Sequence, residues 1–319
     1  MMVVFNQYNQ NMIVTLTLNP SIDLTLTTDR ILYDRHNLIL AEEEDAAGKG
    51  INAARVVHSY GGKVHAITTS GGHRGENFRR MLDNTGVEHT LIPVQGETRR
   101  NVAVTDQNGL TIKVDQVGKH LHPDEVHEIE EALVSKLPDA EWLLLTGSRP
   151  PGVPANFFAR MIQLAIEHDV QTLLDSSEES LRLGITAHPN VTKPNRSEAE
   201  HLLGRRLLSQ TQNTIAANEI RAMGSERVLL SLEDKGVIAA WEEGLIEAVP
   251  PSFETGCPVG AGDVLVATYT WAMTQGKSFV DALRWSVAAA TTAVRKQGLQ
   301  FASLDEIEPI RKQVQLRSL

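Results

Sequence analysis

Pro258-Val259-Gly260-Ala261-Gly262-Asp263 lies near the C-terminal end of this chain and runs into VLVATYTWAM, whose apolar residues have helical spacing. Small residues let a backbone approach a ligand closely, and free N–H groups at a helix start can bind a phosphoryl oxyanion. Asp263 falls in the first turn, where a carboxylate could accept the proton of an attacking hydroxyl. An ordinary acidic residue at a helix N-terminus would give the same pattern.

A second glycine turn, Ala47-Gly48-Lys49-Gly50-Ile51-Asn52, also leads into a helix. Its spacing fits neither the GxGxxG fingerprint nor the Walker A loop. Lys49 and Asn52 could contact a sugar hydroxyl or a phosphate. By itself, however, the segment is better explained as a simple tight turn.

A third segment, Lys193-Pro194-Asn195-Arg196-Ser197-Glu198, follows an expected strand. Asn195 and Glu198 could offer oxygen ligands to Mg²⁺ or to its bound waters, because this hard cation takes oxygen donors and keeps several waters. The alternative is a helix capped by Ser197 with a solvated Glu198.

The rest of the chain alternates between apolar runs of strand length and segments of helical period, which is typical of βαβ units and a mostly parallel sheet. After Gly50, for example, Ala53, Val56, Val57 and Tyr60 form one buried helix face. We expect strands at 12–18, 64–68, 142–146, 172–175, 190–193 and 227–232, and helices at 124–136, 156–167 and 197–203. In such a sheet, ligands bind beyond the carboxyl ends of the strands.

Two stretches, 22–40 and 98–114, interrupt this alternation and are β-rich. Asn108-Gly109 predicts a hairpin turn in the second. Together they could form a small lid that excludes water from a reaction. The acidic run 42–45 is interpreted as a solvated loop. We therefore expect one domain over 12–319, preceded by an N-terminal extension of residues 1–11.

Composition excludes several classes of protein. The chain has 319 residues, 41% of them hydrophobic, and one cysteine, so a disulfide scaffold is ruled out. The formal net charge of -10 opposes a broad grip on nucleic acid. We find neither a secretory signal nor a membrane-spanning stretch, and so expect no membrane association and a cytoplasmic location.

The order of four motifs narrows the interpretation: Leu18-Asn19-Pro20-Ser21-Ile22-Asp23, then the segments at 47–52, 193–198 and 258–263. This order resembles the PfkB (ribokinase-like) carbohydrate kinases, and within them the hexose-phosphate branch that contains the 1-phosphofructokinases. GAGD is highly specific, and the match runs from about Met12 to at least Gly298. It implies an α/β fold: a ribokinase-like three-layer α/β/α sandwich with a mostly parallel central sheet and a small β-sheet lid.

The resemblance implies ATP-dependent, Mg²⁺-assisted phosphorylation of a ketohexose phosphate. Asp263 matches the catalytic base, and the anion hole would be formed by Gly260, Ala261 and Gly262. Asp23 matches the acid that holds sugar hydroxyls. The other positions implied to bind the acceptor are Gly48, Lys49, Asn52, Arg99, Asn101 and Ser148.

For the nucleotide, the resemblance implies contacts from Lys193, Asn195, Ser231 and Gly236, together with Gly260 and Gly262. Asn195 and Glu198 match the magnesium positions, with water between them and the ion. Thr98-Arg99-Arg100-Asn101 resembles the lid segment whose arginine reaches the acceptor's phosphate, an anion that a guanidinium fork fits. For this role we favour Arg99 over Arg100. Lid pairing in this family implies a homodimer.

Four positions depart from the family pattern. Glu233 replaces a usual glycine and puts a charge near the expected nucleotide phosphates. Arg149 replaces an aliphatic residue, and we interpret it as a solvated loop arginine. Cys257 replaces a polar residue and is expected to be an inert thiol. Lys296 stands where asparagine often lies near a monovalent cation, so bound K⁺ is not expected.

The segment AAGKGIN resembles the 1-phosphofructokinase pattern more than the GGGG or AGGKG forms of related kinases. This resemblance favours fructose 1-phosphate as acceptor and fructose 1,6-bisphosphate as product. The same residues would also serve fructose 6-phosphate or tagatose 6-phosphate. A sugar-phosphate or nucleotide sensor without turnover is an alternative of another class, which Glu233 favours and Asp263 opposes. A Rossmann-type NAD(P)-dependent enzyme is disfavoured, because no GxGxxG follows the first strand.

Overall fold

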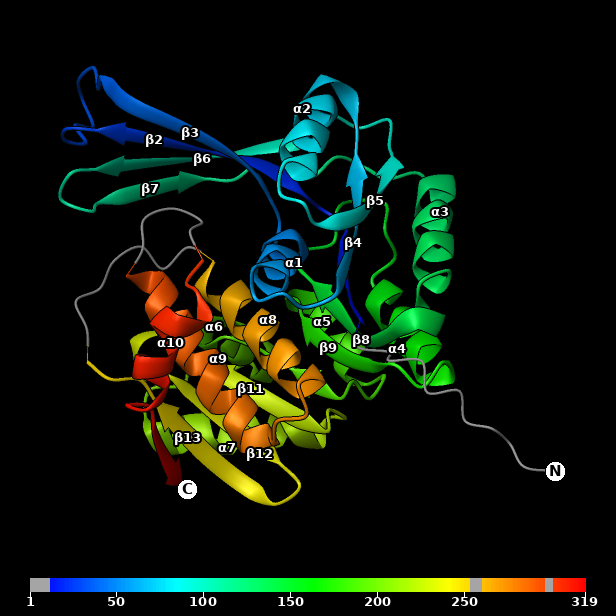
Figure 1. Ribbon diagram of the computed structural model, residues 1–319, viewed down its shortest axis with the longest axis vertical. Coiled ribbons are helices and arrows are strands. Elements are labelled where there is room, and N and C mark those ends of the chain that lie inside the picture. The colour runs from blue at the N-terminus through cyan, green and yellow to red at the C-terminus, as the bar shows by residue number, and fades with distance from the viewer. Residues whose placement is uncertain (1–11, 253–259, 296–300) are drawn as a thin grey trace.

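A ten-stranded sheet forms the centre of the computed structural model, which describes residues 12–252, 260–295 and 301–319 (Figure 1). Seven neighbouring strands are parallel, and three at one edge are antiparallel, so the prediction of a mostly parallel sheet is confirmed. In spatial order the strands are β14 (Gln315–Ser318), β13 (Gly244–Val249), β12 (Val237–Trp241), β11 (Arg227–Ser231), β10 (Val191–Thr192), β9 (Gln171–Asp175), β8 (Ala140–Thr146), β1 (Met12–Thr17), β4 (Val64–Ser70) and β5 (Glu88–Pro93).

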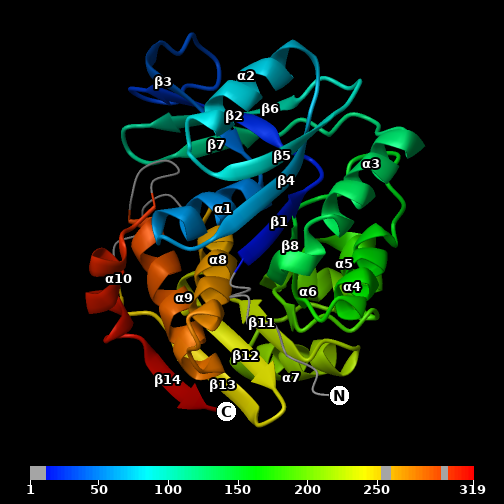
Figure 2. The ribbon, with the colours of Figure 1, turned by 45° about the vertical axis from the view of Figure 1, so that its right-hand side comes forward.

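Helices cover both faces of this sheet and complete three layers (Figure 2). One face packs with α1 (Lys49–Ser59), α2 (Gly72–Asp83), α8 (Ala261–Thr274), α9 (Phe279–Val294) and α10 (Leu304–Arg311). The other face packs with α3 (Pro123–Val134), α4 (Phe157–Glu167), α5 (Glu178–Ile185), α6 (Arg196–Leu203) and α7 (Gln210–Ala222). Short 3₁₀ turns lie at η1 (Leu137–Asp139) and η2 (Glu233–Lys235).

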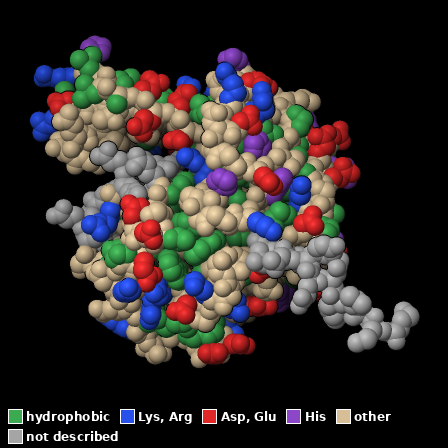
Figure 3. Space-filling view, in the orientation of Figure 1, with side chains coloured by type: hydrophobic (Ala, Val, Ile, Leu, Met, Phe, Trp, Pro, Cys, Tyr) green, Lys and Arg blue, Asp and Glu red, His purple; other side chains and the backbone are tan. Residues whose placement is uncertain are grey.

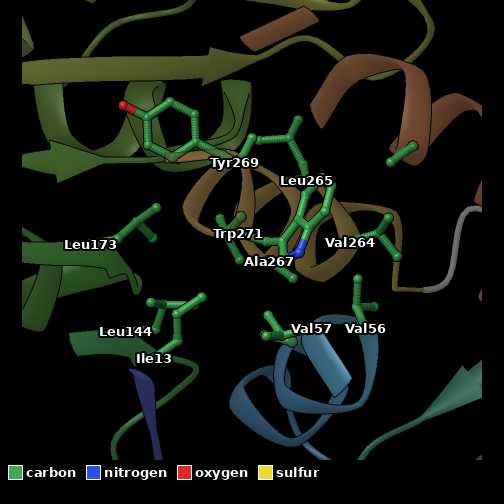
Figure 4. Packing of buried hydrophobic residues seen from close by; sticks show 14 of the residues in the cluster. Ile13, Val56, Val57, Leu144, Leu173, Val264, Leu265, Ala267, Tyr269 and Trp271 are labelled. Atoms are coloured by element: carbon green, nitrogen blue, oxygen red, sulfur yellow. The ribbon is translucent and has the colours of Figure 1, made fainter. Parts of the chain in front are cut away.

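Helix α8 is buried almost all round, as its continuous apolar sequence requires. Figure 4 shows α8 between α1 and the sheet. Trp271 packs on the side of α1, and Tyr269 packs on the side of the sheet. The Trp271 ring meets Tyr60 edge-on at 5.2 Å, and the Tyr269 ring meets Trp142 at 6.1 Å. This packing fixes the N-termini of α1 and α8 relative to each other.

The two β-rich stretches form a separate four-stranded sheet, and the predicted small β lid is confirmed (Figure 1). Its order is β3 (Ile39–Ala47), β2 (Ser21–Thr28), β6 (Arg99–Asp106) and β7 (Thr111–Val114). Strands β2 and β6 are parallel, and β6 and β7 form the predicted hairpin, with Gly109 at φ 86° in its turn.

The prediction of a solvated loop at 42–45 is wrong, because these residues belong to β3, which continues to Ala47. The physical reason is that β3 is an edge strand of a thin sheet, so its carboxylates stay in contact with water while its backbone pairs with β2. No helix in the described part of the chain is long and apolar enough to cross a membrane.

Candidate functional site

The N-terminus of α8 supplies one wall of the site. Gly260 is its N-cap at φ 78°, a left-handed conformation that glycine adopts without strain, and Ala261 and Gly262 are its first two residues. Asp263 follows in the first turn and is only 7% exposed. The rest of the motif, Pro258 and Val259, and the departures Cys257 and Lys296, lie outside the described residues.

The N-terminus of α1 lies against it. Gly48 is the N-cap at φ 143°, and a Cβ there would be 2.7 Å from Cγ2 of Thr17, so glycine is required. The Nδ2 of Asn52 donates a 2.7 Å hydrogen bond to Oδ2 of Asp263. The second glycine segment is therefore more than a tight turn, because it brings Lys49 and Asn52 to the α8 start.

The carboxyl group of Asp263 is tuned by this environment. Burial raises its pKa to about 6, although the nearby Lys49 charge and the Asn52 hydrogen bond both lower it. A carboxyl with this pKa is ionised at neutral pH and accepts a proton more readily than an ordinary aspartate. The arrangement therefore suits a general base.

Lys49 and Lys193 both form ion pairs with the buried carboxylate of Asp175. Asp175, at the end of β9, lies 3.0 Å from Nζ of Lys49 and 3.3 Å from Nζ of Lys193. Burial raises the pKa of Asp175, but the two lysines outweigh this effect and hold the pKa below its ordinary value. The other Asp175 oxygen, Oδ2, is buried without a hydrogen-bond partner among the described residues.

Asn195 and Glu198 lie where β10 leads into α6. They form a reciprocal capping box: the Asn195 side chain accepts from the Glu198 backbone N–H at 2.8 Å, and the Glu198 side chain accepts from that of Asn195 at 2.8 Å. The alternative of a Ser197 cap is thus wrong, because Asn195 is the N-cap. The second Glu198 oxygen, Oε1, lies 4.0 Å from Nζ of Lys49.

Ser231 and Gly236 flank η2 at the end of β11. Ser231 bridges to Asn195, and its backbone N–H donates to the Pro194 carbonyl at 3.0 Å. Gly236 lies at φ 91°, while the exposed Glu233 lies at φ 56°, a left-handed conformation unusual for a residue with a side chain. This loop therefore borders the segment of Lys193 and Asn195.

The lid brings a second polar group over the site. Oδ1 of Asp23 accepts hydrogen bonds from Oγ of Ser21 at 2.7 Å and from Nδ2 of Asn101 at 3.0 Å. Burial raises the pKa of Asp23 in spite of these bonds. Arg99, two residues before Asn101 and on the same face, donates to Oδ1 of Asn101 at 3.2 Å.

Ser148 lies in the loop after β8 and accepts a 3.0 Å hydrogen bond from Nδ2 of Asn19. Its neighbour Arg149 is not the solvated arginine that the sequence suggested. Its side chain is half-buried and donates to the Val153 carbonyl and, at 3.3 Å, to Oγ of Ser180, because the loop folds back onto α5. Arg149 therefore fixes the loop that carries Ser148.

The site thus has two ends along the carboxyl edge of the sheet. Asp23, Asn101, Arg99 and Ser148 lie at the lid end, and Lys193, Asn195, Glu198 and Ser231 lie beyond β9. Asp263, at the start of α8, is hydrogen-bonded to Asn52, and the charges of Lys49 and Lys193 both act on its carboxyl group. Within the described ranges, no three His, Cys, Asp or Glu side chains form a cluster that could hold a metal by themselves.

Asp175 carries no role in the motifs, although its position at a predicted strand end is a signal that points to it. Asn19 lies inside the first motif, but its hydrogen bond to Ser148 can be recognised only in the folded structure.

Comparison with known proteins identifies the family and the fold. The model of the "pfkB family carbohydrate kinase" matches residues 9–307. The 1-phosphofructokinase of Vibrio cholerae is 29% identical, covering 96% of this chain and 97% of that protein. The ATP-dependent 6-phosphofructokinase isozyme 2 of Escherichia coli is 31% identical, covering 93% and 97%.

Two solved structures share the fold. Phosphofructokinase-2 from Escherichia coli, in complex with substrates and products, superposes with a TM-score of 0.88 at 30% identity and covers 95% of this chain and 99% of its own. Ribokinase from Arabidopsis thaliana, complexed with ribose and ATP, gives a TM-score of 0.73 at 20% identity over 94% and 98%. The expected ribokinase-like fold is therefore confirmed.

Proposed function

Because the chain belongs to the pfkB family of carbohydrate kinases, we propose that it transfers the γ-phosphoryl group of ATP to a ketohexose phosphate. Sugar-phosphate kinases are the relatives that it matches over nearly its whole length. We favour fructose 1-phosphate as the acceptor, with fructose 1,6-bisphosphate as the product. Fructose 6-phosphate or tagatose 6-phosphate is the alternative acceptor.

One observation carries the proposal: a buried carboxylate, Asp263, stands in the first turn of a helix that begins with Gly260-Ala261-Gly262, and Asn52 orients it. The helix start offers free N–H groups to the transferring phosphoryl oxygens. Asp263 takes the proton of the attacking hydroxyl. The acceptor oxygen then bonds to the γ-phosphorus, the bond from that phosphorus to the bridging oxygen breaks, and ADP leaves.

The acceptor sugar would be held at the lid end of the site. Asp23 and Asn101 offer polar groups to its hydroxyls, together with Gly48, Lys49, Asn52 and Ser148. Arg99 would bind its phosphate. Within the described chain, the hydrogen bonds of this half-buried guanidinium go to neutral oxygens. The carboxylates of Asp23 and Asp115 act on its charge but form no ion pair with it, which leaves the guanidinium able to bind an anion.

The nucleotide would lie over Lys193, Asn195, Ser231 and Gly236, with its γ-phosphate at the α8 start. The Asn195 side chain and one Glu198 oxygen are engaged in the capping box, so Oε1 of Glu198 is the carboxylate oxygen left outside it. This small set of oxygen donors fits an Mg²⁺ ion carried by the nucleotide better than an ion held by protein ligands alone. Asn195 and Glu198 would reach the ion through water. Bound Mg²⁺ would neutralise charge on the transferring phosphoryl group.

We also propose a homodimer formed through the lid. One face of this single-layer sheet carries five half-exposed apolar side chains, Leu24, Leu26, Val102, Val104 and Ile112. Hydrophobic side chains also gather at the outer end of the lid (Figure 3). Tyr33 and Leu38 there are 81% and 78% exposed. A second copy would bury this surface.

The test is ATP consumption by the purified protein with Mg²⁺ and, in parallel, fructose 1-phosphate, fructose 6-phosphate, tagatose 6-phosphate, ribose and adenosine. Preference for fructose 1-phosphate supports the full proposal. Turnover of another hexose phosphate keeps the mechanism and changes the acceptor. No turnover with any acceptor overturns the proposal in favour of a sensor. We infer that a kinase using ATP in this way acts in the cytoplasm.

A further inference from the structure

Gln116 makes four hydrogen bonds, one to α2 in the body of the protein and three to the start of the lid strand β6. It follows β7 in the segment that returns from the lid. Its side-chain Oε1 accepts from NH1 of Arg74 at 3.1 Å and from the backbone N–H of Arg100 at 2.9 Å. Its backbone carbonyl accepts from NH1 of Arg99 at 2.9 Å, and its backbone N–H donates to Oδ1 of Asn101 at 3.3 Å.

These bonds tie the segment after β7 to two elements that already meet through the hydrogen bonds between Gly71 and Thr98. Arg74 belongs to α2, whereas Arg99, Arg100 and Asn101 begin β6. The side chain of Gln116 bonds to both α2 and β6. These two bonds hold the backbone carbonyl of Gln116 next to NH1 of Arg99. Two residues later, Gly118 lies so close to Asn19 that a Cβ would be 2.3 Å from Oδ1 of that residue.

The hydrogen bonds of Arg99 go to neutral oxygens, and the carboxylates of Asp23 and Asp115 act on its charge without forming an ion pair. Nε donates to the Asn19 carbonyl at 3.2 Å, and NH1 is shared between Gln116 and Asn101. Arg100, by contrast, points to the opposite face and pairs with Glu44 at 2.5 Å. An arginine held by neutral acceptors keeps its charge for a ligand, but its direction depends on the residues that provide those acceptors.

We propose that Gln116 is a positioning residue for the acceptor's phosphate: it acts through Arg99 and not by touching the sugar. This inference rests on the proposed function, since it needs a phosphorylated acceptor. It makes the segment after β7 part of the acceptor site, although none of its residues belongs to a sequence motif. Loss of the anchor should weaken acceptor binding and leave the phosphoryl-transfer step and ATP binding intact.

The test is a double-mutant cycle of Gln116→Met and Arg99→Met. Methionine keeps the length of the glutamine side chain and removes the acceptor oxygen. We expect Gln116→Met to raise KM for the hexose phosphate by roughly tenfold, with kcat and the KM for ATP within about twofold of wild type. In the Arg99→Met background, the same change should have no further effect. A second variant, Arg74→Met, removes one of the two anchoring donors and should show a smaller effect with the same dependence on Arg99.

Independent, multiplying effects of the Gln116 and Arg99 changes would overturn the proposal, as would a fall in kcat that accompanies the rise in KM. If the thermal transition shows that Gln116→Met does not fold, the cycle of Arg74→Met with Arg99→Met replaces it. The proposal then stands only if the effect of Arg74→Met on KM disappears in the Arg99→Met background. Wild-type protein that turns over no hexose phosphate would remove the proposed function and this inference together. Turnover with multiplying effects would remove the inference alone.

Discussion

Asn52 and Asp263 are 211 positions apart in the sequence, yet Nδ2 of one donates a 2.7 Å hydrogen bond to Oδ2 of the other. The bond joins the N-termini of α1 and α8, the two helices whose starts form the centre of the site. It also leaves the second Asp263 oxygen free of this contact. The packing of Tyr60 on Trp271 between the same two helices holds the pair in register.

The first prediction concerns pH. Because burial raises the pKa of Asp263 to about 6, kcat/KM should rise as the pH increases through about 6 and then level off.

The free energy of unfolding should change in the opposite direction. A carboxyl whose pKa is higher in the folded state favours folding below its unfolded pKa, and this contribution is lost as the pH rises through 6. The loss is at most about 3 kcal/mol, measurable as the pH dependence of unfolding in wild type relative to Asp263→Asn.

Replacing Lys49 by methionine should move this pH profile. The Lys49 charge lowers the pKa of Asp263, so its removal should raise that pKa above about 6 and shift the acid limb to higher pH. The shift is measured as kcat/KM against pH for both proteins. Lys63→Met, an exposed lysine before β4, is the control and should leave the limb in place. An unmoved limb in Lys49→Met would mean that another group governs the profile.

Glu233 should reduce both stability and nucleotide affinity. Its φ of 56° is strained for a residue with a Cβ, so Glu233→Gly should stabilise the fold by about 1 kcal/mol in chemical denaturation. Removing the carboxylate next to the Ser231 loop should also tighten ATP binding by several-fold, measured by calorimetry.

Glu233→Gln separates these two effects. Glutamine removes the charge and keeps the strained backbone, so this variant should gain nucleotide affinity without gaining stability. Equal ATP affinity in all three proteins would place Glu233 away from the nucleotide.

The lid interface is tested by two leucines of matched exposure. Leu38 on the lid is 78% exposed, and Leu208 before α7 is 79% exposed. Leu38→Glu should convert a dimer into a monomer in light scattering, because it buries a charge in the proposed interface. Leu208→Glu should leave the mass unchanged. A wild-type monomer at working concentration would contradict the interface itself.

Sequence reasoning predicted the sheet well, because buried parallel strands are continuous apolar runs and their helices carry a clear period. The face formed by Ala53, Val56, Val57 and Tyr60 is buried as expected. It failed at 42–45, where four consecutive acids carry no strand pattern. The strand forms because its backbone pairs with β2, and the local propensities of these residues do not indicate that pairing.

For the site, the glycine turns identified Asp263, Lys49 and Asn52 because tight turns into helices leave a local signature. Asp175 and Gln116 carry no such signature. The first lies at a predicted strand end, but its role becomes clear only when two lysines from different segments converge on its buried carboxylate. The second acts through its own backbone as much as through its side chain, which no residue pattern can show.

The most direct measurement is phosphoryl transfer by Asp263→Asn with the acceptor that wild type prefers, alongside calorimetric binding of that acceptor and of ATP. We predict that kcat falls at least about a hundredfold while both dissociation constants stay within about threefold, because asparagine keeps the shape and loses the base. Phosphorylation at the wild-type rate would contradict the assignment of Asp263 as the catalytic base.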